Sequence, residues 1–180
     1  GRERELAAVN RFLTAPWPRL LLVEGPAGIG KSTLVDAAVW RAAEGGAVAL
    51  VARATMAERD LPYAALASLL PDARIEPTLA ELAAPRRRAL EIALRRVPPE
   101  GGDLDPAALG LAVLDVVRAI ARPVPVLLVV DDLQWCDGPT AAALAFALRR
   151  ADRVPVALLA GVRTGVAAAA VDAIAAALPG

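Results

Sequence analysis

The feature that most constrains this chain is a glycine-rich loop between an apolar run and a helical segment. The loop, GPAGIGKS at positions 25–32, matches the pattern G-x-x-x-x-G-K-[ST]. It follows an apolar run at 20–24 and leads into a helical pattern that reaches position 44, which is the context that such a loop requires. Glycines allow the loop to turn its N–H groups inward around a phosphate, and the helix N-terminus adds a positive dipole. The sequence therefore predicts a phosphate-binding loop.

The side chains that close this loop have separate expected roles. Lys31 would reach the β- and γ-phosphate oxygens, and the Ser32 hydroxyl would ligate Mg²⁺. Lys31 is also the only lysine among twenty basic residues, which indicates that an ammonium group is needed there. Because it would make its contacts only when phosphate arrives, we expect the fold itself not to need it. The remaining nucleotide-binding positions are Gly25, Pro26, Ala27, Gly28, Ile29, Gly30 and Thr33.

A second motif, at 126–132, is an apolar strand that ends in two aspartates. A carboxylate at the end of a buried strand is costly unless a cation awaits it. Beside a phosphate loop, Asp131 would hold the hydrated Mg²⁺ and Asp132 would polarise the attacking water. Taken alone, the motif leaves open a strand that runs into a solvated turn. Many relatives with such a loop carry glutamate at the position of Asp132, so we expect slow hydrolysis.

A third candidate, Arg163, lies at the end of the last predicted strand. If this strand lies between the other two, the side chain would face the γ-phosphate, and a guanidinium group binds phosphate bidentately. An ordinary surface arginine after a strand is the alternative. Asp137 is interpreted as a helix N-cap and not as a catalytic acid, since Gly-Pro-Thr follows it. Arg149 and Arg150 are interpreted as cations at a helix C-terminus, with an arginine finger as the alternative.

Apolar runs alternate with helical patterns along the chain. Strands are expected at 20–24, 47–52, 124–130 and 155–162. Helices are expected at 2–14, 32–44, 63–70, 77–97, 106–121 and 138–150, followed by an alanine-rich helix that ends near 178. This alternation predicts one α/β domain over 1–180, with a mainly parallel sheet and right-handed crossovers. Residues 55–121 would be a helical insertion between the second and third strands. Within it, we expect Glu91 and Arg95 to form an i,i+4 ion pair.

Composition argues against several classes of function. Twenty acidic residues balance the twenty basic ones, so no overall charge favours direct contact with DNA or an anionic membrane. Apolar stretches are far shorter than the ~20 residues of a spanning helix, and no leader is expected. The absence of histidine and the single cysteine argue against a zinc site and fit a cytoplasmic location. With one asparagine and no second lysine, the chain lacks the Asn-Lys-x-Asp loop of guanine-specific proteins, so adenine is the expected base.

Five segments together resemble one family. The segments GRERELAAV, VEGPAGIGKSTL, LPYAALASLL, LGLAVLDVV and VVDDLQWCD resemble, in order and spacing, the ATP-binding domain of large LuxR-type transcriptional regulators. That domain belongs to the STAND class of AAA-like signalling ATPases. The resemblance implies a P-loop NTPase three-layer sandwich of the ASCE/AAA-like type with strand order 2-3-4-1, the last strand being inserted between the phosphate-loop and magnesium strands. It also implies that segment 1–3 lies near the adenine.

The function implied by the resemblance is a slow, Mg²⁺-dependent ATPase that switches a multidomain signalling or transcription protein. Its partners would be ATP, other domains of the parent chain and further copies of itself. Compared with the family, the chain stops before a fifth strand and a helical lid, so we expect it to bind ATP but to hydrolyse it poorly and not to switch alone. Two alternatives are a P-loop kinase that acts on a small molecule and a scaffold that holds ATP without turning it over.

Overall fold

The computed structural model describes residues 2–99, 104–166 and 168–178 of the chain. Within them, four strands form one parallel sheet with the order β1-β4-β3-β2. The strands are β1 (Arg19–Gly25), β2 (Val48–Arg53), β3 (Val126–Asp131) and β4 (Val156–Arg163). Read from the opposite edge, this is the order 2-3-4-1, so the predicted α/β class and strand order are confirmed. Strand β4 therefore lies between β1, which leads into the glycine-rich loop, and β3, which leads into the two aspartates.

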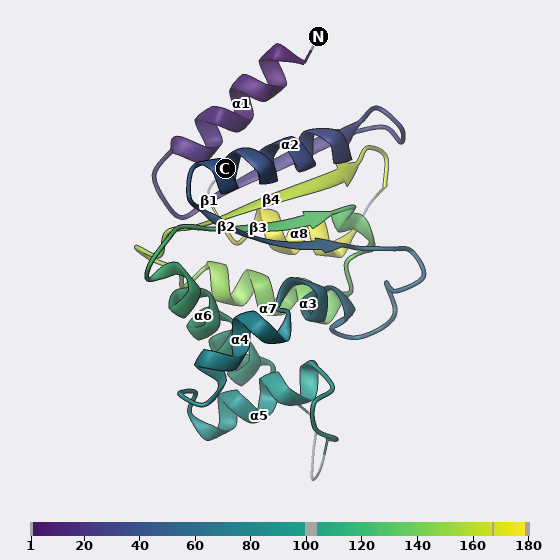
Figure 1. The fold of residues 1–180 in the computed structure, drawn as a ribbon. Helices are drawn as coiled ribbons and strands as arrows, with labels where there is room; N and C mark the ends of the chain where they lie inside the picture. Colours follow the sequence, from purple (N-terminus) through teal and green to yellow (C-terminus); the bar gives the residue numbers. More distant parts are fainter. Residues whose placement is uncertain (1, 100–103, 167, 179–180) are drawn as a thin grey trace.

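Helices cover both faces of the sheet and give three layers (Figure 1). One face carries α1 (Glu3–Thr14) and α2 (Lys31–Glu44). On the other side lie α3 (Ala64–Leu69), α4 (Asp72–Leu79), α5 (Ala84–Ala93), α6 (Pro106–Ala121), α7 (Gly138–Leu148) and α8 (Ala169–Ala175). A short 3-10 helix, η1 (Leu133–Trp135), connects β3 to α7. Within the described ranges, no helix has the length and apolar character needed to span a membrane.

The side chains of the central strands divide between two cores. Leu127 and Val129 of β3 pack on the side of α1 and α2. Leu128 and Val130 point to the opposite side and join the larger core formed with α3 to α8. Every residue of β3 is buried, and complete burial of a valine or leucine side chain contributes about 1.5–3 kcal/mol. Burial on both faces explains why this strand is a continuous apolar run and not an alternating pattern.

The predicted helix at 77–97 is wrong. The structure divides this stretch between α4, which ends at Leu79, and α5, which begins at Ala84. Pro85 lies in the first turn of α5, where its missing N–H leaves no intrahelical bond unmade. Inside one long helix, the same proline would remove a hydrogen bond and clash with the preceding turn. Pro77, which was expected to start a helix, lies inside α4. The other predicted elements coincide with observed ones to within a few residues.

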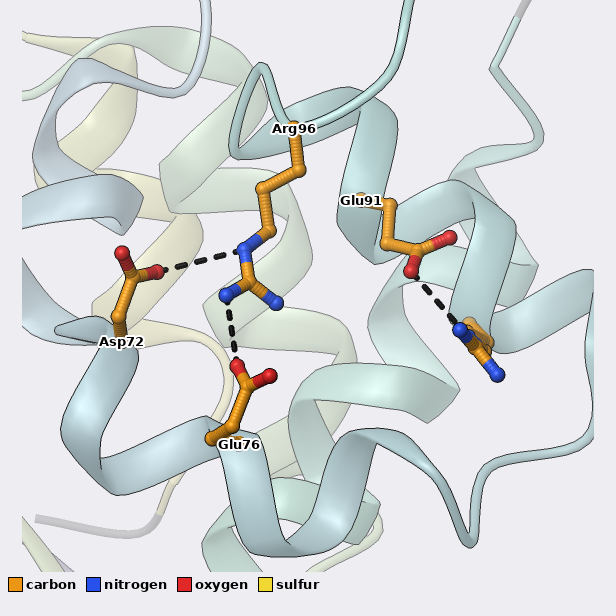
Figure 2. A network of polar contacts seen from close by, with 5 residues as sticks. Asp72, Glu76, Glu91 and Arg96 are labelled. Carbon is orange, nitrogen blue, oxygen red and sulfur yellow. Dashed lines mark hydrogen bonds and ion pairs between the residues drawn. The ribbon is translucent and has the colours of Figure 1, made fainter.

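An arginine that follows α5 connects this helix to α4. Arg96 lies 3.4 Å from Asp72 and 2.6 Å from Glu76 in two ion pairs (Figure 2). Both carboxylates are largely exposed, with side-chain exposures of 77% and 64%. Exposed pairs of this kind are screened by water and contribute roughly 0–1 kcal/mol each. This part of α4 and α5 is therefore a solvated charged face, held mainly by the apolar residues beneath it.

The expected helical ion pair between Glu91 and Arg95 is also wrong. Helix α5 ends at Ala93, and Arg95 beyond it has a left-handed backbone with φ of 57°. Glu91 instead pairs with Arg87, one turn earlier in the helix, at 3.2 Å. The early end of the helix thus moves the i,i+4 partner of Glu91 from the following turn to the preceding one.

Candidate functional site

The glycine-rich loop connects β1 directly to α2. Strand β1 ends at Gly25, and the 14-residue helix α2 begins at Lys31. Gly28 and Gly30 have φ of 74° and 90°, in a region that costs a residue with a Cβ roughly 1–2 kcal/mol. Residues 26–29 between these elements are exposed. The loop therefore stands in solvent at a helix N-terminus, where backbone N–H groups and the helix dipole favour an anion.

Lys31 is 9% exposed, and its ammonium group lies against the loop. Its Nζ donates hydrogen bonds to the carbonyl oxygens of Gly25 and Pro26, each at 2.9 Å. The expectation that Lys31 makes no contact before phosphate arrives is therefore wrong. The physical reason is that a buried ammonium group without partners is costly, so it takes the nearest carbonyl oxygens. The next residues, Ser32 and Thr33, are exposed in the first turn of α2.

Asp131 is the last residue of β3 and is 4% exposed. Its Oδ1 accepts a hydrogen bond from the backbone N–H of Asp132 at 3.1 Å. The same oxygen lies close to Gly161 of β4, where an added Cβ would approach it to 2.4 Å. The absence of a side chain at Gly161 thus makes room for the carboxylate between two strand ends. A nearly buried carboxylate in this position suits the oxygen coordination that Mg²⁺ requires.

Asp132 begins the turn after β3 with a left-handed backbone, φ 56° and ψ 48°. Its Oδ1 accepts a hydrogen bond from Nε2 of Gln134 at 2.7 Å. The Oε1 of the same amide accepts a hydrogen bond from the backbone N–H of Arg163 at 3.0 Å. One buried side chain therefore joins the turn after β3 to the end of β4.

Arg163 is the last residue of β4 and stands opposite Gly25 in the register of β1 and β4. The condition for its predicted role is met, because β4 lies between β1 and β3. Its side-chain Nε is shielded from solvent and has no hydrogen-bond partner among the residues that the structure describes. A buried donor without an acceptor is destabilising, and a phosphate oxygen would supply the acceptor. Contact with the γ-phosphate stays a prediction.

The parallel arrangement of the strands brings these groups to one edge of the sheet. Gly25, Arg163 and Asp131 are the last residues of three adjacent strands. Ligands of open α/β sheets bind outside the carboxyl ends of the strands. The edge combines an ammonium group, a guanidinium group, two carboxylates and a hydroxyl group around one loop. Of these, Ser32 and Asp131 carry the oxygen atoms that could ligate Mg²⁺.

Arg2 lies against the glycine-rich loop from the side of α1. Its guanidinium group donates hydrogen bonds to the carbonyl oxygens of Ile29 and Gly30. A cavity of about 200 Å³ adjoins this contact, with Glu5 and Leu34 among its lining residues. Gly1 lies outside the described residues, and a contact of segment 1–3 with adenine stays a prediction.

Asp137 is the N-cap of α7, which confirms its interpretation from the sequence. Its carboxylate accepts hydrogen bonds from the backbone N–H and the hydroxyl of Thr140, both at 2.8 Å. It also accepts hydrogen bonds from the N–H groups of Tyr63 at 2.8 Å and Ala65 at 3.2 Å, at the start of α3. With 2% exposure and four donors around it, this carboxylate has a structural role.

Burial and the charge of Asp137 also change the titration of two neighbouring groups. They raise the pKa of the Cys136 thiol to about 12, and burial is the larger cause. The same two effects, in the same order, raise the pKa of the Tyr63 hydroxyl. Both groups are therefore protonated at neutral pH, and neither is poised to act as a nucleophile or a base.

Arg149 and Arg150 lie at the end of α7, and Trp135 lies against the larger core. Arg150 follows α7, where its Nη1 donates to the carbonyl of Phe146 at 3.2 Å and its guanidinium lies 3.7 Å from the centre of that ring. Arg149 is the C-cap of the same helix. These positions confirm their interpretation as cations at a helix C-terminus. Trp135 is half-buried and packs against the larger core.

Gln134 and Gly161 were not predicted from the sequence. Gln134 is 6% exposed and is flanked by Leu133 and Trp135 in η1. A signal was present in its position, because an amide in a short apolar segment, two residues after Asp132, has to find partners when it is buried. Which partners it finds depends on the approach of β4, and no local pattern encodes that contact.

Comparisons with known proteins concern the family and the fold. The family model of the AAA ATPase domain matches residues 1–159. The fold is similar to that of the ORC2 protein of Aeropyrum pernix, solved as ADPNP-ADP complexes, with 20% identity and a TM-score of 0.48 over 90% of this chain and 41% of that one. It is also similar to Cdc6p from Pyrobaculum aerophilum, with 15% identity and a TM-score of 0.53 over 98% of this chain and 44% of that one.

The chain thus spans less than half the length of these two proteins, and at such identities the likeness concerns the fold alone. No curated protein matches the chain. The family model, by contrast, covers most of the sequence and includes the glycine-rich loop and both aspartates. The chain therefore belongs to the AAA ATPase domain family.

Proposed function

We propose that this domain binds ATP with Mg²⁺ at the edge formed by β1, β3 and β4, and that it hydrolyses ATP slowly as the regulatory ATPase of a multidomain signalling or transcriptional regulator. The observation that carries the proposal is that the glycine-rich loop with Lys31, the two aspartates and Arg163 all lie at the carboxyl ends of three adjacent parallel strands. Membership of the AAA ATPase domain family supports ATP as the nucleotide. The absence of an Asn-Lys-x-Asp loop from the sequence supports adenine over guanine.

Phosphate binding would rest on the loop and on Lys31. The backbone N–H groups of residues 25–33 would surround the phosphates, assisted by the dipole of α2. Lys31 already points at the loop, where it bonds to the carbonyl oxygens of Gly25 and Pro26. A phosphate oxygen carries negative charge and a carbonyl oxygen does not, so exchanging these carbonyls for phosphate oxygens would add a charge–charge attraction to the ammonium group.

Ser32 and Asp131 would hold the magnesium ion. The Ser32 hydroxyl is exposed in the first turn of α2, and the Asp131 carboxylate stands at the end of β3, which β4 separates from β1. When bound, Mg²⁺ would neutralise negative charge on the β- and γ-phosphate oxygens. The narrow space beside Gly161 would keep the Asp131 carboxylate in a single orientation toward it.

Hydrolysis would use Asp132 and Arg163. Asp132 would accept a proton from the attacking water while the water oxygen bonds to the γ-phosphorus and the bond to the bridging oxygen breaks, which yields ADP and phosphate. Arg163 would donate hydrogen bonds to the γ-phosphate oxygens. A well-placed general base contributes roughly 10²–10⁴ in rate. Aspartate is one methylene shorter than glutamate and reaches less far toward the water, so turnover would be slow.

The regulatory role rests on the sequence resemblance to the ATPase domains of large LuxR-type regulators. In such a role, residues 1–180 would be the ATPase core and 55–121 its helical insertion. The partners would be other domains of the parent chain and further copies of the protein. A slow turnover suits a switch, because the protein then stays in its ATP-bound state long enough for a partner to respond.

Calorimetry and a single-turnover assay test the proposal. We expect ATP to bind more tightly than GTP and in a Mg²⁺-dependent manner, and an excess of protein over labelled ATP to release phosphate at less than about 1 s⁻¹. A nucleotide-exchange assay is expected to show that bound ATP exchanges with ATP in solution no faster than it is hydrolysed. Transfer of the label to a small-molecule acceptor would favour a kinase, and recovery of intact ATP would favour a scaffold. Failure to bind Mg²⁺-ATP would refute the proposal.

A further inference from the structure

We infer that Gln134 is a positioning residue that holds the Asp132 carboxylate in place relative to the end of β4. The inference rests on the proposed function, because Asp132 needs to be positioned only if ATP is hydrolysed at this site. Gln134 lies in η1, after the turn that contains Asp132, and its side chain contacts the end of β4 at Arg163.

The two hydrogen bonds of Gln134 use the two polar atoms of its amide for different purposes. Nε2 donates to Oδ1 of Asp132 at 2.7 Å, and Oε1 accepts from the N–H of Arg163 at 3.0 Å. Oδ2 of Asp132 has no hydrogen-bond partner within the described ranges. One carboxylate oxygen is thus held by the amide, and the other is left for the attacking water.

An amide is well suited to this position. A lysine or arginine would also donate to Asp132, but it would form an ion pair and compete with the water proton for the carboxylate. A neutral amide orients the carboxylate and leaves its charge uncompensated. Gln134 is 6% exposed, and in such surroundings a hydrogen bond is electrostatically stronger than in water. The short contact therefore restricts the otherwise free rotation of the Asp132 side chain.

The bond to Arg163 relates the carboxylate to the strand that would contact the γ-phosphate. Arg163 stands opposite Gly25 in the sheet register, so the end of β4 is fixed with respect to the phosphate loop. Through Gln134 the Asp132 carboxylate is fixed to the same strand end. Misplacing a catalytic group by about 1 Å can reduce a rate by about a hundredfold, so this connection bears directly on the hydrolysis step.

A purely structural role for Gln134 is the competing explanation, and Thr140 supplies a matched control. The Thr140 hydroxyl is also buried, donates one hydrogen bond to Asp137 at 2.8 Å and accepts one from the N–H of Leu66 at 3.1 Å. Neither partner belongs to the loop or to the strand ends at the proposed site. Thr140→Val and Gln134→Met each remove one donated and one accepted side-chain hydrogen bond.

The experiment compares the chain with these two variants by thermal unfolding, Mg²⁺-ATP affinity and single-turnover hydrolysis. Both variants are expected to unfold at lower temperature. Gln134→Met is expected to slow hydrolysis about tenfold, the effect of one ~1.4 kcal/mol interaction in the transition state, with an affinity within about threefold of the unchanged chain. Thr140→Val is expected to hydrolyse ATP at the unchanged rate. In an Asp132→Asn background, Gln134→Met is expected to slow hydrolysis no further, because the group that it positions is gone.

The outcomes separate the inference from the proposed function. If the unchanged chain binds no Mg²⁺-ATP, the proposed function fails and the inference falls with it. If the chain binds and hydrolyses ATP, an unchanged rate in Gln134→Met overturns the inference alone. The inference is also overturned if Thr140→Val loses as much hydrolysis rate as Gln134→Met, or if Gln134→Met adds a further loss of rate in the Asp132→Asn background. ATP binding without any turnover overturns it as well. If Gln134→Met does not fold, Gln134→Glu keeps the acceptor for Arg163 and removes the donor to Asp132; a normal rate in that variant overturns the inference.

Discussion

Replacing Gly161 with alanine tests the close approach of the Asp131 carboxylate to β4. The new Cβ would lie 2.4 Å from Oδ1 of Asp131 and 3.5 Å from the backbone nitrogen of Asp132. The first distance is about 1 Å short of the 3.4 Å at which ordinary contact begins, so the carboxylate has to move by about that much. Both strand ends are packed, and overpacking of this kind costs about 1–3 kcal/mol.

The two expected consequences are separable by assay. For a chain of this size a loss of 1 kcal/mol lowers the melting temperature by about 2–4 °C, so Gly161→Ala should melt about 2–12 °C lower in differential scanning calorimetry. Displacing the carboxylate by about 1 Å should weaken ATP binding in the presence of Mg²⁺ by about tenfold or more. Binding measured in EDTA should change little, because Asp131 would act through the metal.

Gly138 provides the matched control for this variant. It begins α7, and an added Cβ there would meet nothing within 4 Å. Gly138→Ala should therefore leave both the melting temperature and the Mg²⁺ response nearly unchanged. If Gly161→Ala behaves like Gly138→Ala in both assays, the crowding of Asp131 against β4 and its role in holding the metal are both refuted.

Three further predictions concern the loop, the aspartates and the buried thiol. Lys31→Ala should abolish ATP binding measured by calorimetry. It should also cost about 1–3 kcal/mol of stability, because it removes two hydrogen bonds from a charged donor. Unchanged ATP affinity in a folded variant would contradict the loop assignment. Asp131→Asn should weaken the Mg²⁺ dependence of ATP binding. Asp132→Asn should leave ATP binding intact and slow single-turnover hydrolysis about 10²-fold or more. An equal loss of ATP binding in both variants would show that this division of roles is wrong. The pKa of Cys136 is raised from 9.0 to about 12, so the thiol ionises at lower pH in the unfolded chain than in the folded one. Its contribution to stability is therefore complete below pH 9.0 and is lost as the pH rises toward about 12. Urea unfolding at pH 8 to 11 should therefore show a steeper decline for the unchanged chain than for Cys136→Ala, and equal slopes would argue against the raised value.

The sheet could be predicted from local patterns because its central strands are buried on both faces. A strand with no exposed residue, such as β3, is a continuous apolar run, and such a run is easily separated from the helical patterns around it. The phosphate loop was equally accessible, since its glycines, Lys31 and Ser32 are adjacent in the sequence. Asp131 and Asp132 were found because they follow a buried strand directly.

The parts that were missed or mistaken depend on contacts between distant segments or on competition between alternatives. Gln134 finds its second partner on β4, 29 residues later in the chain. The division between α4 and α5 depends on Pro85, which fits the start of a helix as readily as it breaks the middle of one. Lys31 bonds to carbonyls of its own loop because of its burial, and burial follows from tertiary packing and not from the motif.

The shared cap at Asp137 has a consequence for the order in which the domain folds. Its carboxylate caps the N-terminus of α7 and also accepts hydrogen bonds from the N–H groups at the start of α3, 74 and 72 residues earlier in the chain. Helix α3 has only six residues, and helices so short are not stable in isolation. The first turn of α3 can therefore be completed only after the segment between β3 and α7 is in place. Contacts between such distant segments form slowly because a long loop has to close first. We therefore expect α3 to acquire protection from hydrogen exchange later than the sheet. A weakened cap at Asp137 would unfold α3, whereas α7 would keep the hydrogen bonds within its own helix.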